Sequence, residues 1–328
     1  MEGNRGRGSV SKGGRWLWAL VSVVALAAAA CGGGGAGTDT GAQGTIATTA
    51  AQGTAATTPT TAADGTTATT AAEGLLAELQ ERGVARIGIA NEVPYGYEDE
   101  SGNVTGEAPE VAKEVLSRLG IPEVEAVVVE FGALIPALQA GQFDMIAAGM
   151  FITPERAEQI LFSDPDYCGA TAFAVPEGNP LGLSDFQSVV ESGAQLGVLS
   201  GAVEEGYALE SGVPDANLSR FGDTPSLFDA LQAGRIDAVA LTDVTVATQV
   251  AALPGFESTP GFIPVIDGEE QLGCGGFGFM DEGFRDAFNE VLNEMQANDE
   301  IFPIVETFGF SKVAVEKAKE LTVEDLTG

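Results

Sequence analysis

Hydrophobic and polar positions follow two spacings along residues 75–328, and together these spacings predict an α/β fold. Short apolar runs such as residues 84–90 and 196–199 are typical of strands. Between such runs the apolar residues recur every three or four positions, as around Val111, where the predicted helix ends at Gly120. Strands and helices that alternate in this way form sheets covered by helices.

The predicted elements fall into two successive sets. The first set contains strands over 84–90, 127–129 (buried) and 144–148 and helices over 75–82, 111–119, 133–140 and 154–161, the last with Thr153 as N-cap and Pro154 in its first turn. The second set contains strands over 170–175, 196–199 and 236–241 and helices capped by Ser184, over 203–209 and from Thr224 to Gly234. Near residues 275–280 the chain returns to the first set, and helices follow from Asp281. Two crossings predict a hinged molecule of two lobes, whose ligand binds at the carboxyl ends of strands that face each other across a cleft.

The N-terminal residues carry the pattern of an export signal. Four cationic side chains precede the apolar run 16–30, which is shorter than the roughly 20 residues of a membrane-spanning helix. The small residues 28–30 lead directly into Cys31, which resembles the cleavage box of bacterial lipoproteins, where the cysteine is acylated. We therefore predict a lipoprotein signal peptide over residues 1–30 and a lipid anchor at Cys31. An ordinary signal peptide with an accidental cysteine is the alternative.

Residues 31–74 consist almost wholly of Gly, Ala and Thr, and we predict that they form a disordered tether. The tether and the signal contain equal numbers of acidic and basic residues. The chain as a whole has 48 acidic and 15 basic side chains, so residues 75–328 carry the entire formal charge of −33. Such a surface repels nucleic acid, which we exclude as a partner, and it is best tolerated at high ionic strength.

The chain contains no histidine, and this excludes several kinds of chemistry. Ser-His-Asp and Cys-His catalysis and any zinc site that needs imidazole are ruled out. Residues 273–278 match G-x-G-x-x-G, but no clear strand pattern precedes them, so we interpret them as a glycine-rich crossover. We expect no cofactor and no metal.

The three cysteines suggest one disulfide. If Cys31 is lipidated, Cys168 and Cys274 remain as an even pair outside the cytoplasm, where disulfides form. Two free buried thiols are the alternative.

Four motifs between residues 84 and 167 identify a family. They are VPYGY at 93–97, GALIPALQAG at 132–141, AGMFITPER at 148–156 and FSDP at 162–165. Together they resemble the family 3 extracellular solute-binding proteins, the receptors of ATP-driven importers, and the resemblance extends to about residue 312. It implies a type II periplasmic-binding-protein fold, in which two α/β lobes joined by a two-strand hinge close on the ligand. The expected lobes are residues 75–174 plus 271–328 and residues 175–270.

The same resemblance implies a protein without enzymatic activity that delivers its ligand to an ABC permease. We expect a monomer at the outer face of the membrane or in the periplasm. Most relatives bind amino acids, and in them the counterpart of Arg156 grips the α-carboxylate. An aspartate for the α-amino group usually follows Asp237 by five positions, where this chain has Thr242, with Asp243 one step beyond. The carboxylate clamp is therefore present, whereas the ammonium clamp is altered.

Within the family the sequence resembles ectoine/hydroxyectoine-binding proteins. The matches are ANEVPY at 90–95, EFG at 130–132, GMF at 149–151, PER at 154–156, GNPLGL at 178–183 and the cysteines 168 and 274. This resemblance implies an aromatic box for the ring cation, a carboxylate for the ring nitrogens and a guanidinium for the ligand carboxylate. The residues in these roles are Tyr95, Phe131 and Phe151 for the box, Glu92 for the nitrogens and Arg156 for the carboxylate. Val203 stands where the subgroup has threonine, so backbone groups near Ala202 and Glu204 are expected to contribute.

Each of these residues also has a structural explanation. Phe131 is suited to core packing, Phe151 to a hydrophobic staple, Tyr95 to the lip of the cleft, Arg156 to a surface ion pair and Glu92 to a solvent-exposed position. Two other functions stay open at this point. A polar amino-acid receptor is favoured if Asp243 rather than Thr242 faces the cleft. A dehydratase of cyclic carboxylic acids would use groups such as Glu92 as acid and base.

Overall fold

The computed structural model describes residues 74–328. The predicted signal peptide, Cys31 and all of the predicted tether except Gly74 lie outside the described residues. Within the described part of the chain, no helix is both long and apolar enough to cross a bilayer.

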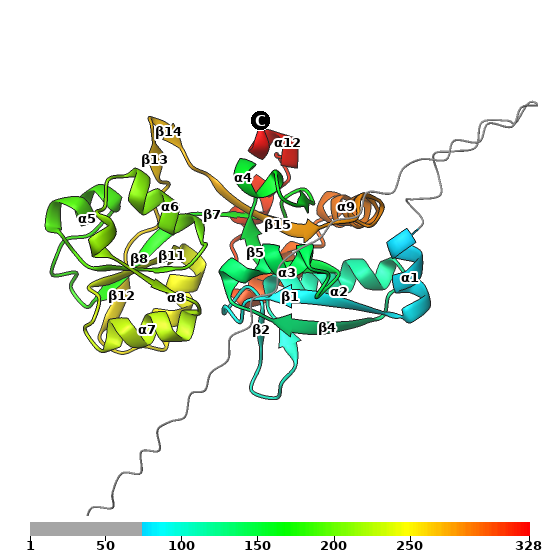
Figure 1. Cartoon of the computed structure of the whole chain (residues 1–328), viewed down its shortest axis with the longest axis horizontal. Coiled ribbons are helices and arrows are strands. Elements are labelled where there is room, and N and C mark those ends of the chain that lie inside the picture. The colour runs from blue at the N-terminus through cyan, green and yellow to red at the C-terminus, as the bar shows by residue number, and fades with distance from the viewer. Residues whose placement is uncertain (1–73) are drawn as a thin grey trace, which may run out of the picture. The chain divides into compact units, whose positions relative to one another are not determined.

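The first lobe is built on a six-stranded sheet (Figure 1). Its strands in spatial order are β4 (Glu123–Val128), β1 (Val84–Ile89), β5 (Met145–Phe151), β15 (Gly273–Phe279) and β6 (Leu161–Phe162), with β7 (Tyr167–Gly169) also paired to β15. Strand β1 runs parallel to β4 and β5, whereas β15 runs antiparallel to β5, β6 and β7. The carboxyl ends of β1 and β5 therefore lie at one edge, and the loops that follow them carry several of the predicted site residues.

Helices and a small hairpin complete the first lobe. The helices are α1 (Gly74–Arg82), α2 (Glu107–Arg118), α3 (Leu134–Gln139), α4 (Pro154–Ala157), α9 (Glu282–Ala297), α10 (Phe302–Val305), α11 (Lys312–Ala318) and α12 (Val323–Thr327), and the hairpin joins β2 (Tyr97–Glu98) to β3 (Val104–Thr105). Short 3₁₀ turns occupy Phe131–Ala133 and Glu306–Phe308. Apolar faces of α1, α2 and α9 bury Leu79, Val111 and Phe288 in one cluster with the sheet.

The second lobe is built on a five-stranded sheet. Its strands in spatial order are β10 (Leu218–Phe221), β9 (Leu196–Leu199), β11 (Ala238–Thr242), β8 (Thr171–Pro176) and β12 (Phe256–Ser258). The helices drawn around this sheet in Figure 1 are α5 (Phe186–Ser192), α6 (Val203–Glu210), α7 (Thr224–Gln232) and α8 (Asp243–Ala251), and a 3₁₀ turn spans Asp215–Asn217. Strands β9, β10 and β11 are mutually parallel, so their carboxyl ends also share one edge.

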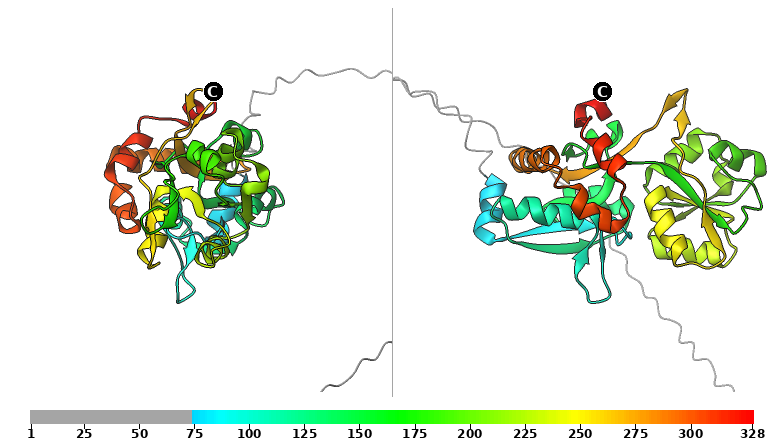
Figure 2. Two further views of the ribbon diagram at one scale, coloured as in Figure 1. Left: turned by 90° about the vertical axis from the view of Figure 1, so that its left-hand side faces the viewer. Right: turned by 180° about the vertical axis from the view of Figure 1, so that it is seen from behind.

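The chain passes between the sheets twice. It leaves the first sheet after β7 and enters the second at β8, and it returns from β12 through the hairpin of β13 (Val265–Ile266) and β14 (Glu269–Glu270) to β15. Cys168 on β7 and Cys274 on β15 are register partners, and a disulfide joins them. Helix α11 covers this junction and buries Ala318 against the two cysteines; the right-hand view of Figure 2 shows this C-terminal region beside the first sheet.

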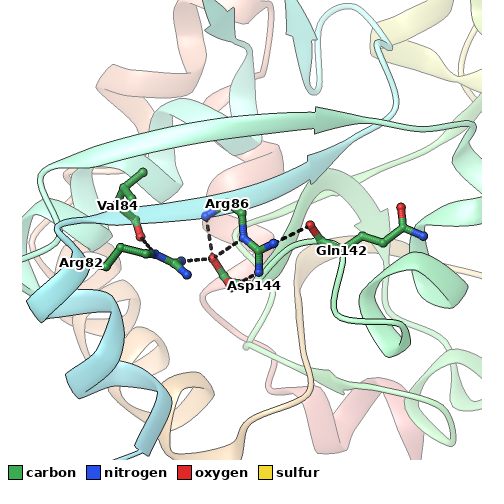
Figure 3. A network of polar contacts seen from close by, with 5 residues as sticks. All are labelled: Arg82, Val84, Arg86, Gln142 and Asp144. Carbon is green, nitrogen blue, oxygen red and sulfur yellow. Dashed lines mark hydrogen bonds and ion pairs between the residues drawn. The ribbon is translucent and has the colours of Figure 1, made fainter.

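A buried carboxylate ties α1, β1 and the start of β5 together (Figure 3). Asp144 accepts hydrogen bonds from the Arg86 backbone N–H at 2.8 Å and from Arg86 Nη2 at 2.9 Å, and it pairs with Arg82. Arg86 also donates from Nη1 to the Gln142 carbonyl at 3.1 Å. Burial opposes the ionisation of Asp144, but the hydrogen bonds and positive charges of the two arginines outweigh it, so its pKa lies below the usual value.

Three local expectations from the sequence are wrong. The strand predicted as buried at 127–129 belongs to β4, which lies at a sheet edge and leaves Val128 45% exposed. The helix predicted over 154–161 ends at Ala157, because Leu161 and Phe162 pair with β15 instead. Helix α5 is capped by Asp185 rather than Ser184, since the Asp185 side chain accepts the hydrogen bond from the Ser188 N–H.

Candidate ligand-binding site

A small pocket lies where the loops of the two sheets meet. It is lined by Glu92, Tyr95, Phe131, Gly149, Phe151, Arg156, Leu199, Ala202, Val203, Glu204, Leu241 and Thr242. All nine residues that the sequence suggested for ligand binding are among these, and they come from both lobes. The sequence interpretation did not include Gly149, Leu199 or Leu241.

The loop after β1 presents Glu92 and Tyr95. Glu92 and Gly96 exchange backbone hydrogen bonds of 3.0 Å each, which closes a tight loop around Tyr95. The first N–H groups of α2 hold the same loop, since Ala108 donates to the Tyr95 carbonyl at 3.0 Å. The Tyr95 ring packs directly on Gly149, whose φ of 62° and missing Cβ leave the space that the ring occupies. Hydrogen bonds therefore hold the backbone of Tyr95, and packing on Gly149 positions its ring.

The three rings expected to form an aromatic box all line the pocket, but they have different neighbours. Tyr95 and Phe151 both contact Tyr167, with ring centroids 5.4 and 6.0 Å apart. Phe131 lies in the 3₁₀ turn before α3, and its ring centroid is 5.6 Å from Cζ of Arg156. Tyr167, which donates from its hydroxyl to the Gly149 carbonyl at 2.7 Å, is thus a supporting residue that the sequence interpretation missed.

Arg156 reaches from the first lobe to the second. Thr153 caps the short helix α4 by accepting the Arg156 N–H, and the side chain is only 9% exposed. Its Nη1 donates to the Phe151 carbonyl at 2.6 Å, and its Nη2 donates to the Gly201 carbonyl at 2.9 Å. Burial lowers the pKa of Arg156, and the nearby charge of Glu204 opposes this effect. Two of five guanidinium donors are used, so the group retains donors for a ligand carboxylate.

Glu92 also contacts the second lobe. Thr245 on α8 donates a 2.8 Å hydrogen bond to Oε1 of Glu92, and both side chains are buried. Burial raises the pKa of Glu92 to about 7; the hydrogen bond from Thr245 opposes the rise, and the charge of Glu204 adds to it. Sequence reasoning missed Thr245, because the stretch that forms α8 was not predicted as a helix.

Three polar atoms at the pocket are buried without a hydrogen-bond partner among residues 74–328. They are the Tyr95 hydroxyl, the Thr242 hydroxyl and Oε1 of Glu204. A buried polar group left unpaired costs roughly 1–3 kcal/mol, so a bound molecule that satisfies these atoms gains affinity.

Thr242 and Asp243, at the end of β11, differ in whether they line the pocket. Thr242 lines the pocket, whereas Asp243 starts α8 and is not among the lining residues. Its Oδ1 accepts a hydrogen bond from the Val244 N–H at 2.9 Å. In addition, residues 74–328 contain no group of three or more potential metal-ligating side chains.

Two α/β lobes linked by two chain crossings, with a small polar and aromatic pocket between them, define the class of a hinged solute receptor. The chain belongs to the bacterial extracellular solute-binding proteins, family 3, whose sequence model matches residues 85–311. It is a solute-binding protein of an ABC importer of the amino-acid type and not an enzyme. The family and the type II periplasmic-binding-protein fold predicted from the motifs are confirmed, and the dehydratase alternative is wrong.

Three relatives illustrate the similarity. The probable amino-acid ABC transporter periplasmic-binding protein y4tE of Sinorhizobium fredii (strain NBRC 101917 / NGR234) is 36% identical over 256 residues, which cover 76% of this chain and 85% of that protein. The histidine-binding periplasmic protein of Escherichia coli (strain K12) is 29% identical over 213 residues, covering 62% of this chain and 79% of that protein. The crystal structure of EhuB in complex with hydroxyectoine is 39% identical with a TM-score of 0.72, and the match covers 78% of this chain and 98% of that one.

Proposed function

We propose that this protein captures ectoine or hydroxyectoine and delivers it to an ABC permease. The observation that carries the proposal is the single pocket that unites Arg156, Glu92 and the three rings of Tyr95, Phe131 and Phe151. These groups suit a compact zwitterion with a carboxylate and a delocalised cation. The similarity to EhuB, solved with hydroxyectoine, supports the proposal.

The ligand carboxylate is expected at Arg156 and the start of α6. A guanidinium matches a carboxylate with paired hydrogen bonds. Ala202, the N-cap of α6, supplies no side-chain hydrogen bond to the helix, so backbone N–H groups of the first turn are available to an anion. These backbone N–H groups would replace the hydrogen bond that a threonine hydroxyl gives at the position of Val203.

The ligand cation is expected between the aromatic rings and Glu92. A cation over an aromatic face gains about 0.5–2 kcal/mol per contact, more when water is excluded. Glu92 supplies an acceptor for ring N–H groups. Because Arg156 and Glu92 both contact the second lobe, through Gly201 and Thr245, ligand contacts and lobe contacts form together. Bound ligand therefore favours the closed arrangement by its differential affinity.

Isothermal titration calorimetry with a ligand panel tests the proposal. The panel contains ectoine, hydroxyectoine, glycine betaine and the standard amino acids. We expect ectoine or hydroxyectoine to bind at least about tenfold more tightly than any other member, a difference of about 1.4 kcal/mol. Tighter binding of a standard amino acid would show that the ligand assignment is wrong while the family stays correct.

A polar amino acid is the second candidate ligand. The observation that favours it is the similarity to the histidine-binding protein of Escherichia coli, together with the Arg156 side chain at the pocket. The position of Asp243 outside the pocket lining weakens this candidate, because the ammonium clamp expected there is displaced. The same ligand panel decides between the two.

We also propose the export and domain organisation that the sequence predicts. Residues 1–30 act as a lipoprotein signal peptide, Cys31 is acylated, and residues 31–74 tether the two lobes to the outer face of the membrane. The lobe boundary expected at residue 174 falls inside β8, which belongs to the second sheet, so the first crossing lies between β7 and β8. The sequence of the cleavage box supports this proposal, and we expect the lobes to act as a monomer. Cys31→Ala should release the protein into the medium or periplasm, as measured by immunoblots of membrane and soluble fractions. Unchanged membrane retention would contradict the anchor.

A further inference from the structure

Glu204 is a buried carboxyl that the predicted binding scheme does not use. It lies in the first turn of α6, lines the pocket and is 2% exposed. Within the part of the chain that the structure describes, its Oε1 has no hydrogen-bond partner. An acidic residue near a helix N-terminus stabilises the helix without burial, and the half-buried Glu205 next to it already does so. Stabilisation of the helix therefore does not explain why Glu204 points into the pocket.

When both of its carboxyls are ionised, the pocket contains more negative than positive side-chain charge. Its lining includes the carboxyls of Glu92 and Glu204 and the guanidinium of Arg156. In the described part of the chain, none of these three side chains forms an ion pair within 4.0 Å. All three charged groups are therefore available to a ligand. A ligand carboxylate pairs only with the guanidinium, so the two carboxyls require positive charge on the ligand.

The two carboxyls come from different lobes. Glu92 follows β1 in the first lobe, and Glu204 starts α6 in the second. Closure of the lobes brings both to one small pocket, where their charges repel each other. A cation held between them removes this repulsion and provides the hydrogen that Oε1 of Glu204 lacks.

We propose that the Glu204 carboxyl is a second cation-binding group and that the pocket selects ligands whose positive charge is shared by at least two N–H groups. This inference rests on the proposed function, because it concerns the same pocket and names the ligand class more narrowly. A cyclic amidinium fits, since its two N–H groups face different directions and reach one carboxyl each. A quaternary ammonium has no N–H group and therefore donates a hydrogen bond to neither carboxyl.

Glu204→Gln tests the inference, because the substitution keeps the shape of the side chain and removes its charge. Glu210→Gln is the matched control, since it removes an exposed carboxylate from the same helix. Titrations use ectoine, histidine, arginine and glycine betaine as probes. We expect Glu204→Gln to weaken ectoine binding at least about tenfold and to reduce the preference for ectoine over glycine betaine, whereas Glu210→Gln stays within about twofold of the wild type.

The outcomes separate this inference from the proposed function. If the wild type binds arginine or histidine rather than ectoine, the proposed function fails. The inference then requires that Glu204→Gln weakens the binding of that amino acid. If Glu204→Gln binds within about twofold of the wild type, or if glycine betaine binds as tightly as ectoine, the inference is overturned. Absence of binding by all four probes contradicts both. Thermal unfolding checks that the variant folds, and Glu204→Asp, which retains the charge, decides the matter if Glu204→Gln does not fold.

Discussion

At the scale of single residues, Glu92 and Glu204 are the side chains of the pocket most sensitive to pH. Burial raises the pKa of each to about 7. For Glu92 the hydrogen bond from Thr245 opposes the rise; for Glu204 its own backbone N–H and Arg156 oppose it. A ligand cation favours the ionised carboxyls, so it binds more tightly where they have already lost their protons.

Affinity for a cationic ligand group should therefore fall as the pH falls through 7. A carboxyl with a pKa of about 7 that must ionise on binding costs roughly a factor of ten in affinity between about pH 8 and pH 6. Titration calorimetry in two buffers of different ionisation enthalpy measures both the affinity and the protons released. Glu204→Gln should show a shallower pH dependence than the wild type. An affinity that is independent of pH, without proton release near pH 6, would contradict the expectation.

Phe151 offers a second test at this scale, because its ring belongs to the pocket and to the core of the first lobe. Phe151→Leu keeps an apolar side chain but removes the aromatic face. We expect ligand affinity to fall by roughly 3- to 30-fold, in line with one cation–π contact. Phe162→Leu, a core substitution in the same lobe outside the pocket lining, should lower stability to a similar extent and leave affinity unchanged. Equal affinities of the two variants would remove Phe151 from the cation site.

At the scale of elements, strand β15 packs against two aromatic rings at the pocket. A Cβ at Gly273 would lie 1.9 Å from the Phe151 ring, and one at Gly275 would lie 2.1 Å from the Tyr167 ring. The glycines interpreted from the sequence as a crossover therefore provide the flat surface on which these rings pack. The motif match to a nucleotide loop arises because packing of rings on a strand also requires glycine.

Gly275→Ala should displace the Tyr167 ring and lower the free energy of unfolding by about 1–3 kcal/mol, as overpacking does. Gly206→Ala is the control, because nothing lies within 4 Å of its Cβ position and alanine favours the α6 helix. That variant should gain about 0.5–1 kcal/mol. Urea unfolding followed by circular dichroism measures both. Equal stability of the two variants would show that the ring does not depend on Gly275.

The elements also show how far the sequence allows prediction. Regular periodicity located α2, α6 and α7, and the family resemblance pointed to nine of the residues that line the pocket. Helix α8 was missed because five of its nine residues are Val or Thr, which lose rotamer freedom in helices and favour strands. Tertiary packing overrides that preference, and Thr245 was missed with it. The exposure of β4 was missed because the pattern within a strand does not reveal its place in a sheet.

At the scale of the whole described molecule, a second acidic pair links the loop after β1, which presents Tyr95, to β7, after which the chain first crosses between the sheets. Glu107, the first residue of α2, and Asp166, directly before β7, are both buried. Glu107 donates its backbone N–H to the Pro94 carbonyl at 2.9 Å, so it lies behind the loop that presents Tyr95. Burial raises the pKa of Tyr167, which follows Asp166, and the charge of Glu107 raises it further. The pair thus lies where three segments of the first lobe meet: the loop after β1, α2 and the start of β7.

Burial raises the pKa of Glu107 well above its usual value and that of Asp166 to about 6, and the proximity of Asp166 raises the pKa of Glu107 further. The folded state therefore binds protons more tightly than the unfolded state. The stability from this pair is fully present below the unfolded pKa values near 4 and is lost as the pH rises through the folded ones. Acidification should strengthen this junction, in contrast to its effect on ligand binding.

Glu107→Gln should reveal this dependence, because the amide resembles the protonated carboxyl and cannot lose a proton. We compare the free energy of unfolding of the variant with that of the wild type. The difference, variant minus wild type, should rise between about pH 5 and pH 8. The expected rise is roughly 1.4 kcal/mol for each unit by which the Glu107 pKa is raised within that range. Urea unfolding at several pH values measures it. Glu114→Gln, which changes a side chain 44% exposed on the same helix, controls for the loss of one negative charge from the chain and should show a nearly constant difference. A constant difference for Glu107→Gln as well would mean that the pKa of Glu107 is not raised in the folded state and that the junction is insensitive to pH.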